Sequence, residues 1–209
     1  MTPTLSVFYF LVLIFSIIVH EVAHGLMAER EGDPTARMLG RITLNPLKHV
    51  DWIGSVFLPL ILILSNTGIV FGWAKPVPYN PDNLKRGNKS VALVSIAGIL
   101  VNLGLAVIFG LFIRLMILGG ATPAAAPLLD MASIIVLVNI VLALFNAMPV
   151  APLDGFRFLS AVLPARAQPM LQLIEQYSLP IFILFILVLW KFVAPVAYTL
   201  YSLITGIPL

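Results

Sequence analysis

Hydrophobic residues gather in five long stretches along the chain, and the polar residues lie mainly between them. Each stretch is long enough to reach across or into the hydrocarbon core of a bilayer. They cover about residues 5–28, 52–71, 91–118, 131–148 and 178–204. This pattern predicts an all-α polytopic membrane protein.

Composition indicates the same class. Of the 209 residues, 60% are hydrophobic and 10% are charged, whereas the charged share of an ordinary soluble domain is about a quarter. There is room for four or five spans with short loops, and no internal repeat or low-complexity linker divides the chain. We expect residues 1–209 to form a single membrane-embedded core without an appended soluble domain. No basic residue precedes the first stretch, which favours a retained span over a cleaved signal peptide.

The net charge of +3 comes from basic residues in the connectors, mainly residues 29–50 and 72–90. Basic connectors are typical of cytoplasmic loops and of contact with lipid head groups. Residues 119–130, in contrast, hold no basic residue. We therefore expect a multi-pass protein of the cell (plasma or inner) membrane, with the lipid bilayer as a partner and no nucleic acid partner.

The first stretch contains the sequence His-Glu-Val-Ala-His at residues 20–24. On a helix, His20 and His24 lie about 40° apart on one face, so both imidazoles can bind one divalent metal. Glu21 then faces the same cavity and can act as the general base that deprotonates an attacking water. Because the chain has no cysteine, the ligands must be histidine and carboxylate, for which zinc is the natural metal. Ionisable groups are costly in an apolar helix, which favours a hydrolytic site over a chance pairing.

A turn-forming segment, residues 146–155, closes the fourth stretch with two prolines, Asp154 and Gly155. Zinc in hydrolases commonly takes three protein ligands and one water, so Asp154 can supply the carboxylate that two histidines lack. It can equally cap the helix that begins near Gly155, because aspartate is a favoured N-cap residue. This segment alone leaves both interpretations open.

Three apolar stretches separate His24 from Asp154, yet a shared metal site needs both residues on one side of the membrane. Residues 52–71 are the stretch best suited to remain on one side, because glycine and proline interrupt it and both flanking connectors are basic. The interrupting residues are Gly54, Pro59 and Gly68. We predict a re-entrant or interfacial segment there, about four full crossings, and a metal site toward the cytoplasmic side.

Residues 41–46, within the segment 38–46, alternate between polar and apolar positions and end at a proline. This pattern predicts a short strand-like edge near the site. An extended substrate could pair with such an edge by strand addition.

The two motifs together resemble those of the site-2 proteases, a family of intramembrane zinc metallopeptidases. Three further segments look like those of its small bacterial and archaeal members: Gly40–Pro46, Gly72–Pro78 and Ala97–Asn102. Two positions depart from the pattern, with Ile99 where the family often has proline and Phe156 where it often has a second glycine. Phe156 could narrow the approach to the metal or change only the packing.

The resemblance implies a role for each site residue. His20, His24 and Asp154 would bind one zinc ion per chain. Glu21 would be the general base, and Asn146 would contact the substrate near the metal or steady the developing oxyanion.

The expected function is that of an intramembrane zinc metalloendopeptidase. Its partners would be transmembrane proteins or peptides, which it would cut in or near their transmembrane segments, as in regulated intramembrane proteolysis. The alternative is a non-catalytic membrane zinc-binding protein or transporter, which has no need of a general base. The Glu21→Gln variant separates the two, because only a protease should lose its function.

Four other polar residues receive less specific expectations. We interpret His49 as an interfacial residue and not a ligand, and Arg114 as reaching for the membrane interface. Asn102 fits helix packing, with substrate binding as the alternative. Lys191 either pairs with an acid inside the bundle or extends toward the interface.

Overall fold

A computed structural model describes residues 3–57, 60–61, 64–65, 74–185 and 190–208, and every regular element within these ranges is a helix. The longer helices are α1 (Pro3–Arg30), α4 (Asn88–Leu118), α5 (Ala126–Asn146), α6 (Asp154–Val162), α7 (Gln168–Gln176), α8 (Ser178–Leu184) and α9 (Trp190–Thr205). Shorter elements are α2 (Thr35–Met38), η1 (Pro46–Lys48), the π-helical η2 (Trp52–Phe57), η3 (Pro81–Asn83), η4 (Pro123–Ala125) and η5 (Ala165–Ala167).

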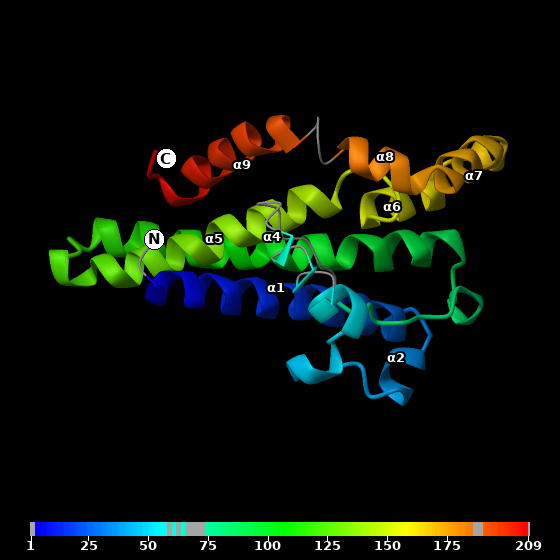
Figure 1. Ribbon diagram of the computed structural model, residues 1–209, viewed down its shortest axis with the longest axis horizontal. Coiled ribbons are helices and arrows are strands. Elements are labelled where there is room, and N and C mark those ends of the chain that lie inside the picture. The colour runs from blue at the N-terminus through cyan, green and yellow to red at the C-terminus, as the bar shows by residue number, and fades with distance from the viewer. Residues whose placement is uncertain (1–2, 58–59, 62–63, 66–73, 186–189, 209) are drawn as a thin grey trace.

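Three of the described helices are long and apolar enough to cross a membrane: α1, α4 and α5. The candidate spans are Thr4–Arg30, Asn88–Leu118 and Pro123–Asn146. They confirm the apolar stretches predicted at 5–28, 91–118 and 131–148. In Figure 1 they form the body of the molecule, with α4 packed against both α1 and α5.

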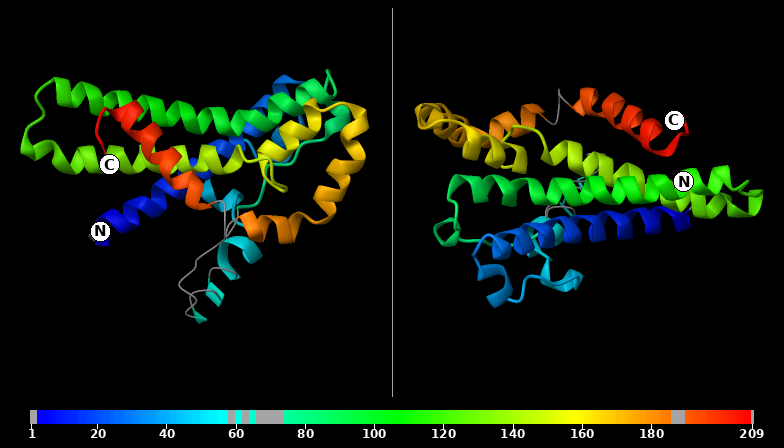
Figure 2. Two further views of the ribbon diagram at one scale, coloured as in Figure 1. Left: turned by 90° about the horizontal axis from the view of Figure 1, so that it is seen from above. Right: turned by 180° about the vertical axis from the view of Figure 1, so that it is seen from behind.

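The direction of these helices explains how the two motifs meet. Helix α4 runs antiparallel to α1 and α5, so the C-terminal ends of α1 and α5 and the N-terminal end of α4 share one end of the bundle (Figures 1 and 2). The connector from α1 to α4 therefore begins and ends at the same end of the bundle. Asp154, which follows α5, can thus lie near His24 at the C-terminal end of α1. Half of the predicted re-entrant segment 52–71 lies outside the described residues, which include η2 and residues 60–61 and 64–65 of it.

The predicted strand at 38–46 was wrong, because this segment forms turns and bends. Its backbone donors are used locally: the N–H of Gly40 bonds to the carbonyl of Arg37, that of Arg41 to Ala36 and that of Thr43 to Arg41. Alternating side chains do not make a strand without a partner for the backbone groups.

The last apolar stretch, 178–204, corresponds to α8 and α9, and residues 186–189 between them lie outside the described residues. Helix α9 packs on α4 and α5 around a buried apolar cluster that includes Ile113, Val136 and Tyr201. Lys191 at its start is exposed. The Arg114 Nε donates to the carbonyl of Ile204, so this arginine holds the C-terminal end of α9.

Short polar contacts fasten the basic connectors to the end of α1. Buried Glu31 accepts from Arg86 and from the Ser90 hydroxyl, and buried Asp33 accepts from the Asn80 N–H at 2.7 Å. His49, expected at the interface, is buried, and its Nε2 donates to the Thr43 carbonyl at 2.9 Å. These contacts fix the segments that cover the candidate site.

Candidate active site

His20 and His24 lie one turn apart on α1, as their spacing predicts. Both are buried, their ring centroids are 4.7 Å apart, and their Nε2 atoms are 3.0 Å apart. Two imidazoles whose Nε2 atoms face one point can supply two of the ligands of a single metal ion.

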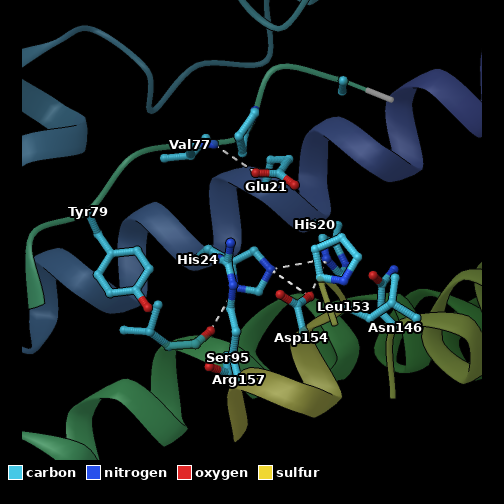
Figure 3. A pocket seen from close by; sticks show the side chains of 14 residues that line it. His20, Glu21, His24, Val77, Tyr79, Ser95, Asn146, Leu153, Asp154 and Arg157 are labelled. Carbon is cyan, nitrogen blue, oxygen red and sulfur yellow. Dashed lines mark hydrogen bonds and ion pairs between the residues drawn. The ribbon is translucent and has the colours of Figure 1, made fainter. Parts of the chain in front are cut away.

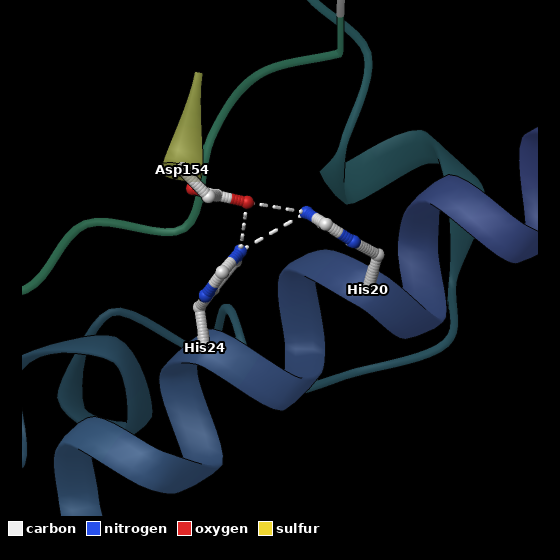
Figure 4. Close-up of side chains that lie close together, drawn as sticks. All are labelled: His20, His24 and Asp154. Carbon is white, nitrogen blue, oxygen red and sulfur yellow. Dashed lines mark hydrogen bonds and ion pairs between the residues drawn. The ribbon is translucent and has the colours of Figure 1, made fainter. Parts of the chain in front are cut away.

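Asp154 completes the group. Its Oδ2 lies 2.9 Å from His20 Nε2 and 3.0 Å from His24 Nε2, and Figure 4 shows the three side chains converging from α1 and the start of α6. The helix-cap interpretation was wrong, because the N-cap of α6 is Leu153 and the carboxylate of Asp154 faces the histidines. Burial alone would raise the pKa of the Asp154 carboxyl, but hydrogen bonds and charge from both histidines hold it below its usual range.

Gly155 allows the chain to place Asp154 here. A Cβ at residue 155 would lie 2.3 Å from the backbone oxygen of Ala147, so the start of α6 passes directly against the end of α5. Only glycine fits this approach, which explains the Asp-Gly pair after the two prolines.

The three atoms fit zinc in kind and in spacing. Two neutral imidazoles and a carboxylate are a common donor set of zinc hydrolases. Tetrahedral coordination at 2.0–2.1 Å separates ligand atoms by about 3.4 Å, close to the 2.9–3.0 Å found between the atoms of this cluster. The Nδ1 of His24 donates to the Val94 carbonyl at 2.7 Å, which leaves the Nε2 lone pair directed at the cluster.

Glu21 lines the same cavity of about 370 Å³ as both histidines and Asp154. Its Oε2 accepts a hydrogen bond of 2.8 Å from the Val77 N–H, as Figure 3 shows. The segment that carries Val77 is held in turn by Arg41, whose guanidinium donates to the carbonyls of Lys75 and Pro76 at 2.8 and 3.2 Å. Two connectors thus orient the Glu21 carboxylate beside His20, His24 and Asp154, which we call the metal group.

Asn146 is the last residue of α5 and lines this cavity together with Tyr79 and Arg157. Its Nδ2 donates to the Leu142 carbonyl at 3.0 Å, which uses one of its two amide hydrogens. The predicted substrate contact thus lies at the rim of the metal group (Figure 3).

A second, mostly apolar cavity of about 450 Å³ adjoins the first. It shares His20, Glu21 and Asn146 with the metal cavity, and its other walls include Phe145 and Phe182. Phe156, in contrast, is buried against Ala151 and Leu171. It also lines a cavity of about 410 Å³ that shares Tyr79, Pro152 and Arg157 with the metal cavity.

Several contacts of the site were not found from the sequence: Val94 beside His24, the Val77 N–H on Glu21, and Gly98 and Asn102 beside His20. The only available signal was the family resemblance of the segments that contain Gly98, Asn102 and Val77. Backbone donors and acceptors carry no sequence signature, because every residue has them.

Comparison with known proteins identifies relatives along most of the chain. Residues 114–189 match the sequence model of peptidase family M50. A Bacillus subtilis protein named "Putative zinc metalloprotease YwhC" is 38% identical over 198 residues, which cover 93% of this chain and 84% of that protein.

More distant relatives are mycobacterial. A Mycobacterium tuberculosis protein named "Putative zinc metalloprotease Rip2" is 29% identical over 181 residues, or 86% of this chain and 64% of that protein. The Rip2 protein of Mycolicibacterium smegmatis is 29% identical over 170 residues, or 79% of this chain and 61% of that protein. The chain thus spans less than two thirds of the Rip2 proteins. No solved structure matches it.

Proposed function

The chain belongs to peptidase family M50, the site-2 protease family, and is a zinc metalloprotease, and from this premise we propose that it hydrolyses peptide bonds in or near the transmembrane segments of membrane proteins. One observation carries the proposal. A cluster of two imidazoles and a carboxylate lies beside Glu21 within a bundle of membrane-length helices. Such cleavage is the chemistry of regulated intramembrane proteolysis.

His20, His24 and Asp154 hold one zinc ion per chain in this proposal. Bound zinc would supply Lewis acidity, which lowers the pKa of water and polarises a carbonyl. The chain supplies the ligands, their orientation and the surrounding apolar walls.

Glu21 moves the proton. It takes a proton from the water as the water oxygen adds to the carbonyl carbon of the substrate, and it returns that proton to the amide nitrogen as the C–N bond breaks. The hydrogen bond from the Val77 N–H fixes the orientation of the carboxylate for this transfer.

Asn146 contacts the substrate. Its second amide hydrogen is available to a carbonyl oxygen at the rim of the metal cavity, where negative charge develops during the addition.

The apolar cavity supports a membrane substrate. Its phenylalanine and leucine walls suit hydrophobic side chains of a transmembrane segment, and it opens directly onto His20 and Glu21. A substrate helix must unwind before its peptide bonds are exposed, because its amides are hydrogen-bonded within the helix.

The distribution of charge supports an active site toward the cytoplasmic side of the cell membrane. Eight of the twelve Lys and Arg residues fall between the last turn of α1 and the first turn of α4, at the end of the bundle that holds the metal group. Helix α9 runs away from this end in the direction of α4 (Figure 1), which supports a fourth crossing by the last apolar stretch. We propose about four crossings, a re-entrant or interfacial segment at 52–71, and one membrane-embedded domain.

A zinc transporter receives less support. Ion pathways need ionisable groups through successive spans. Outside the site, the charged residues of the three described spans lie within five residues of a helix end: Glu29, Arg30, Lys89, Arg114 and Asp130.

The test is cleavage of a single-span model substrate in detergent by wild type and Glu21→Gln, with zinc content measured on both. We expect the variant to keep its zinc and to lose about 10²- to 10⁴-fold in rate, the range for a general acid–base group. Glu29→Gln is the matched control, because Glu29 lies on the same helix and pairs with Arg37 outside the cavity, and it should cleave normally. Zinc binding without cleavage by wild type, or full activity of Glu21→Gln, would refute the proposed roles.

A further inference from the structure

Asn102 on α4 is fully buried at the depth of the metal group. Its Nδ2 lies 3.4 Å from His20 Nδ1, and its Oδ1 has no hydrogen-bond partner among the described residues. A buried carbonyl oxygen that accepts no hydrogen bond costs free energy in an apolar span. The unpartnered Oδ1 of Asn102 therefore needs a physical explanation.

The orientation of His20 indicates which atom of the amide faces its ring. Its Nε2 faces His24 and Asp154, and a nitrogen that binds a metal must be unprotonated there. The neutral ring then carries its proton on Nδ1, the atom that faces Asn102. A half-turn of the Asn102 amide exchanges its oxygen and nitrogen with little change in shape and places an acceptor opposite this N–H.

We propose that Asn102 is a positioning residue that accepts a hydrogen bond from the Nδ1–H of His20 through Oδ1 and so holds Nε2 toward the metal. This inference rests on the proposed zinc site. An acceptor on the far nitrogen selects the correct tautomer and makes the ligating nitrogen more basic.

Gly98, one turn before Asn102 on α4, supports the assignment independently. A Cβ at residue 98 would lie 2.5–2.6 Å from three atoms of the His20 ring, so the ring lies directly against the backbone of α4. The His20 ring is therefore confined by Gly98 and can meet the amide of Asn102.

One face of α4 thus serves both histidines. Val94, Gly98 and Asn102 follow at intervals of four residues, which places them in one row along the helix. The Val94 carbonyl receives the Nδ1–H of His24, and Asn102 does the same for His20 in the antiparallel α1.

The experiment compares zinc affinity, by competition with a chelator, in full-length wild type, Asn102→Leu and Asn102→Asp. Leucine keeps the approximate volume and removes the acceptor, so we expect affinity to fall about 10- to 100-fold. Ionised aspartate keeps an acceptor and cannot donate, so we expect it to retain affinity within about threefold of wild type. If the amide donated to Nδ1 instead, aspartate would lose as much affinity as leucine, and the proposal would be overturned.

Asn139→Leu is the matched control. Asn139 is also fully buried in a span and its Oδ1 likewise has no partner among the described residues, but its Nδ2 donates to the Ser16 hydroxyl and to the Ile135 carbonyl and contacts no ligand histidine. We expect this variant to bind zinc as wild type does. Equal losses of zinc affinity in Asn139→Leu and Asn102→Leu would show that the loss comes from general destabilisation of the protein. That result would overturn the assignment.

A second measurement does not require any variant to fold. In zinc-loaded wild type with ¹⁵N-labelled histidine, the His20 proton should be on Nδ1 and should have the chemical shift of a hydrogen-bonded N–H, and a proton on Nε2 or an unbonded Nδ1–H would refute the proposal. Failure of wild type to bind zinc at all would instead refute the proposed metal site.

Discussion

Asp33 is a buried carboxylate outside the site, and it joins the two basic connectors. It accepts hydrogen bonds from the backbone of Asn80 at 2.7 Å, from the side chain of Asn83 at 2.8 Å and from the hydroxyl of Thr35. Burial would raise the pKa of Asp33, but these bonds together lower it below its ordinary value.

The depressed pKa of Asp33 predicts a pH-dependent contribution to stability. A carboxyl whose folded pKa lies below its unfolded value of about 3.9 stabilises the fold fully above that value and loses this contribution as pH falls through the folded pKa. We expect Asp33→Asn to melt below wild type at pH 7 in detergent and the gap to narrow below about pH 4. Asp82→Asn, at an exposed position of η3, should show no such gap. A gap that is independent of pH would contradict the assignment.

At the scale of the element, α4 is the scaffold of the metal group. It supplies no ligand, yet its backbone and side chains meet both histidines along one face. Small residues on that face let α1 approach closely, as in many membrane helix pairs.

This role of α4 predicts a difference between two glycine substitutions in one helix. Gly98→Ala would drive a Cβ into the His20 ring, whereas a Cβ at Gly104 would meet no atom within 4 Å. We expect Gly98→Ala to lose at least about tenfold in zinc affinity and Gly104→Ala to behave as wild type. The measurement is chelator competition, with thermal unfolding as a check of folding. Equal zinc affinity in the two variants would show that the close approach does not position the ring.

At the scale of the whole molecule, the outer surface of the bundle is apolar. Large hydrophobic side chains such as Phe10 of α1 and Leu111 and Leu115 of α4 are exposed, as expected of a surface that faces lipid. The polar contacts gather at the end of the bundle where the connectors and the metal group lie.

The arrangement predicts which loops a membrane-impermeant reagent can reach. Because the chain has no cysteine, single substitutions report on topology without background labelling. We expect Ala124→Cys, between α4 and α5, to react on intact cells, and Asp82→Cys, at the metal end, to react only after permeabilisation. The opposite pattern would place the active site on the outer side.

Much of the fold follows from the sequence alone. Long apolar runs in lipid must satisfy their backbone groups internally, so the stretches that became α1, α4 and α5 had to be helices. The helical period also places His20 and His24 on one face without further information. The segment at 38–46 shows what a sequence pattern cannot predict. A strand needs a neighbouring strand for its backbone hydrogen bonds, and the alternation of side chains does not specify one.

The position of Asp154 beside the histidines was decided by tertiary structure, since capping and metal binding were equally consistent with its local sequence. It lies 134 residues from His20 along the chain and meets it only because α4 turns back and α5 returns to the same end. The partners of the site, Val94, Val77 and Asn102, are likewise set by packing between distant segments. Sequence determined the spans and the residues available for chemistry, because both depend on local period and composition. Packing decided which of those residues meet, because contacts between distant residues leave no local pattern.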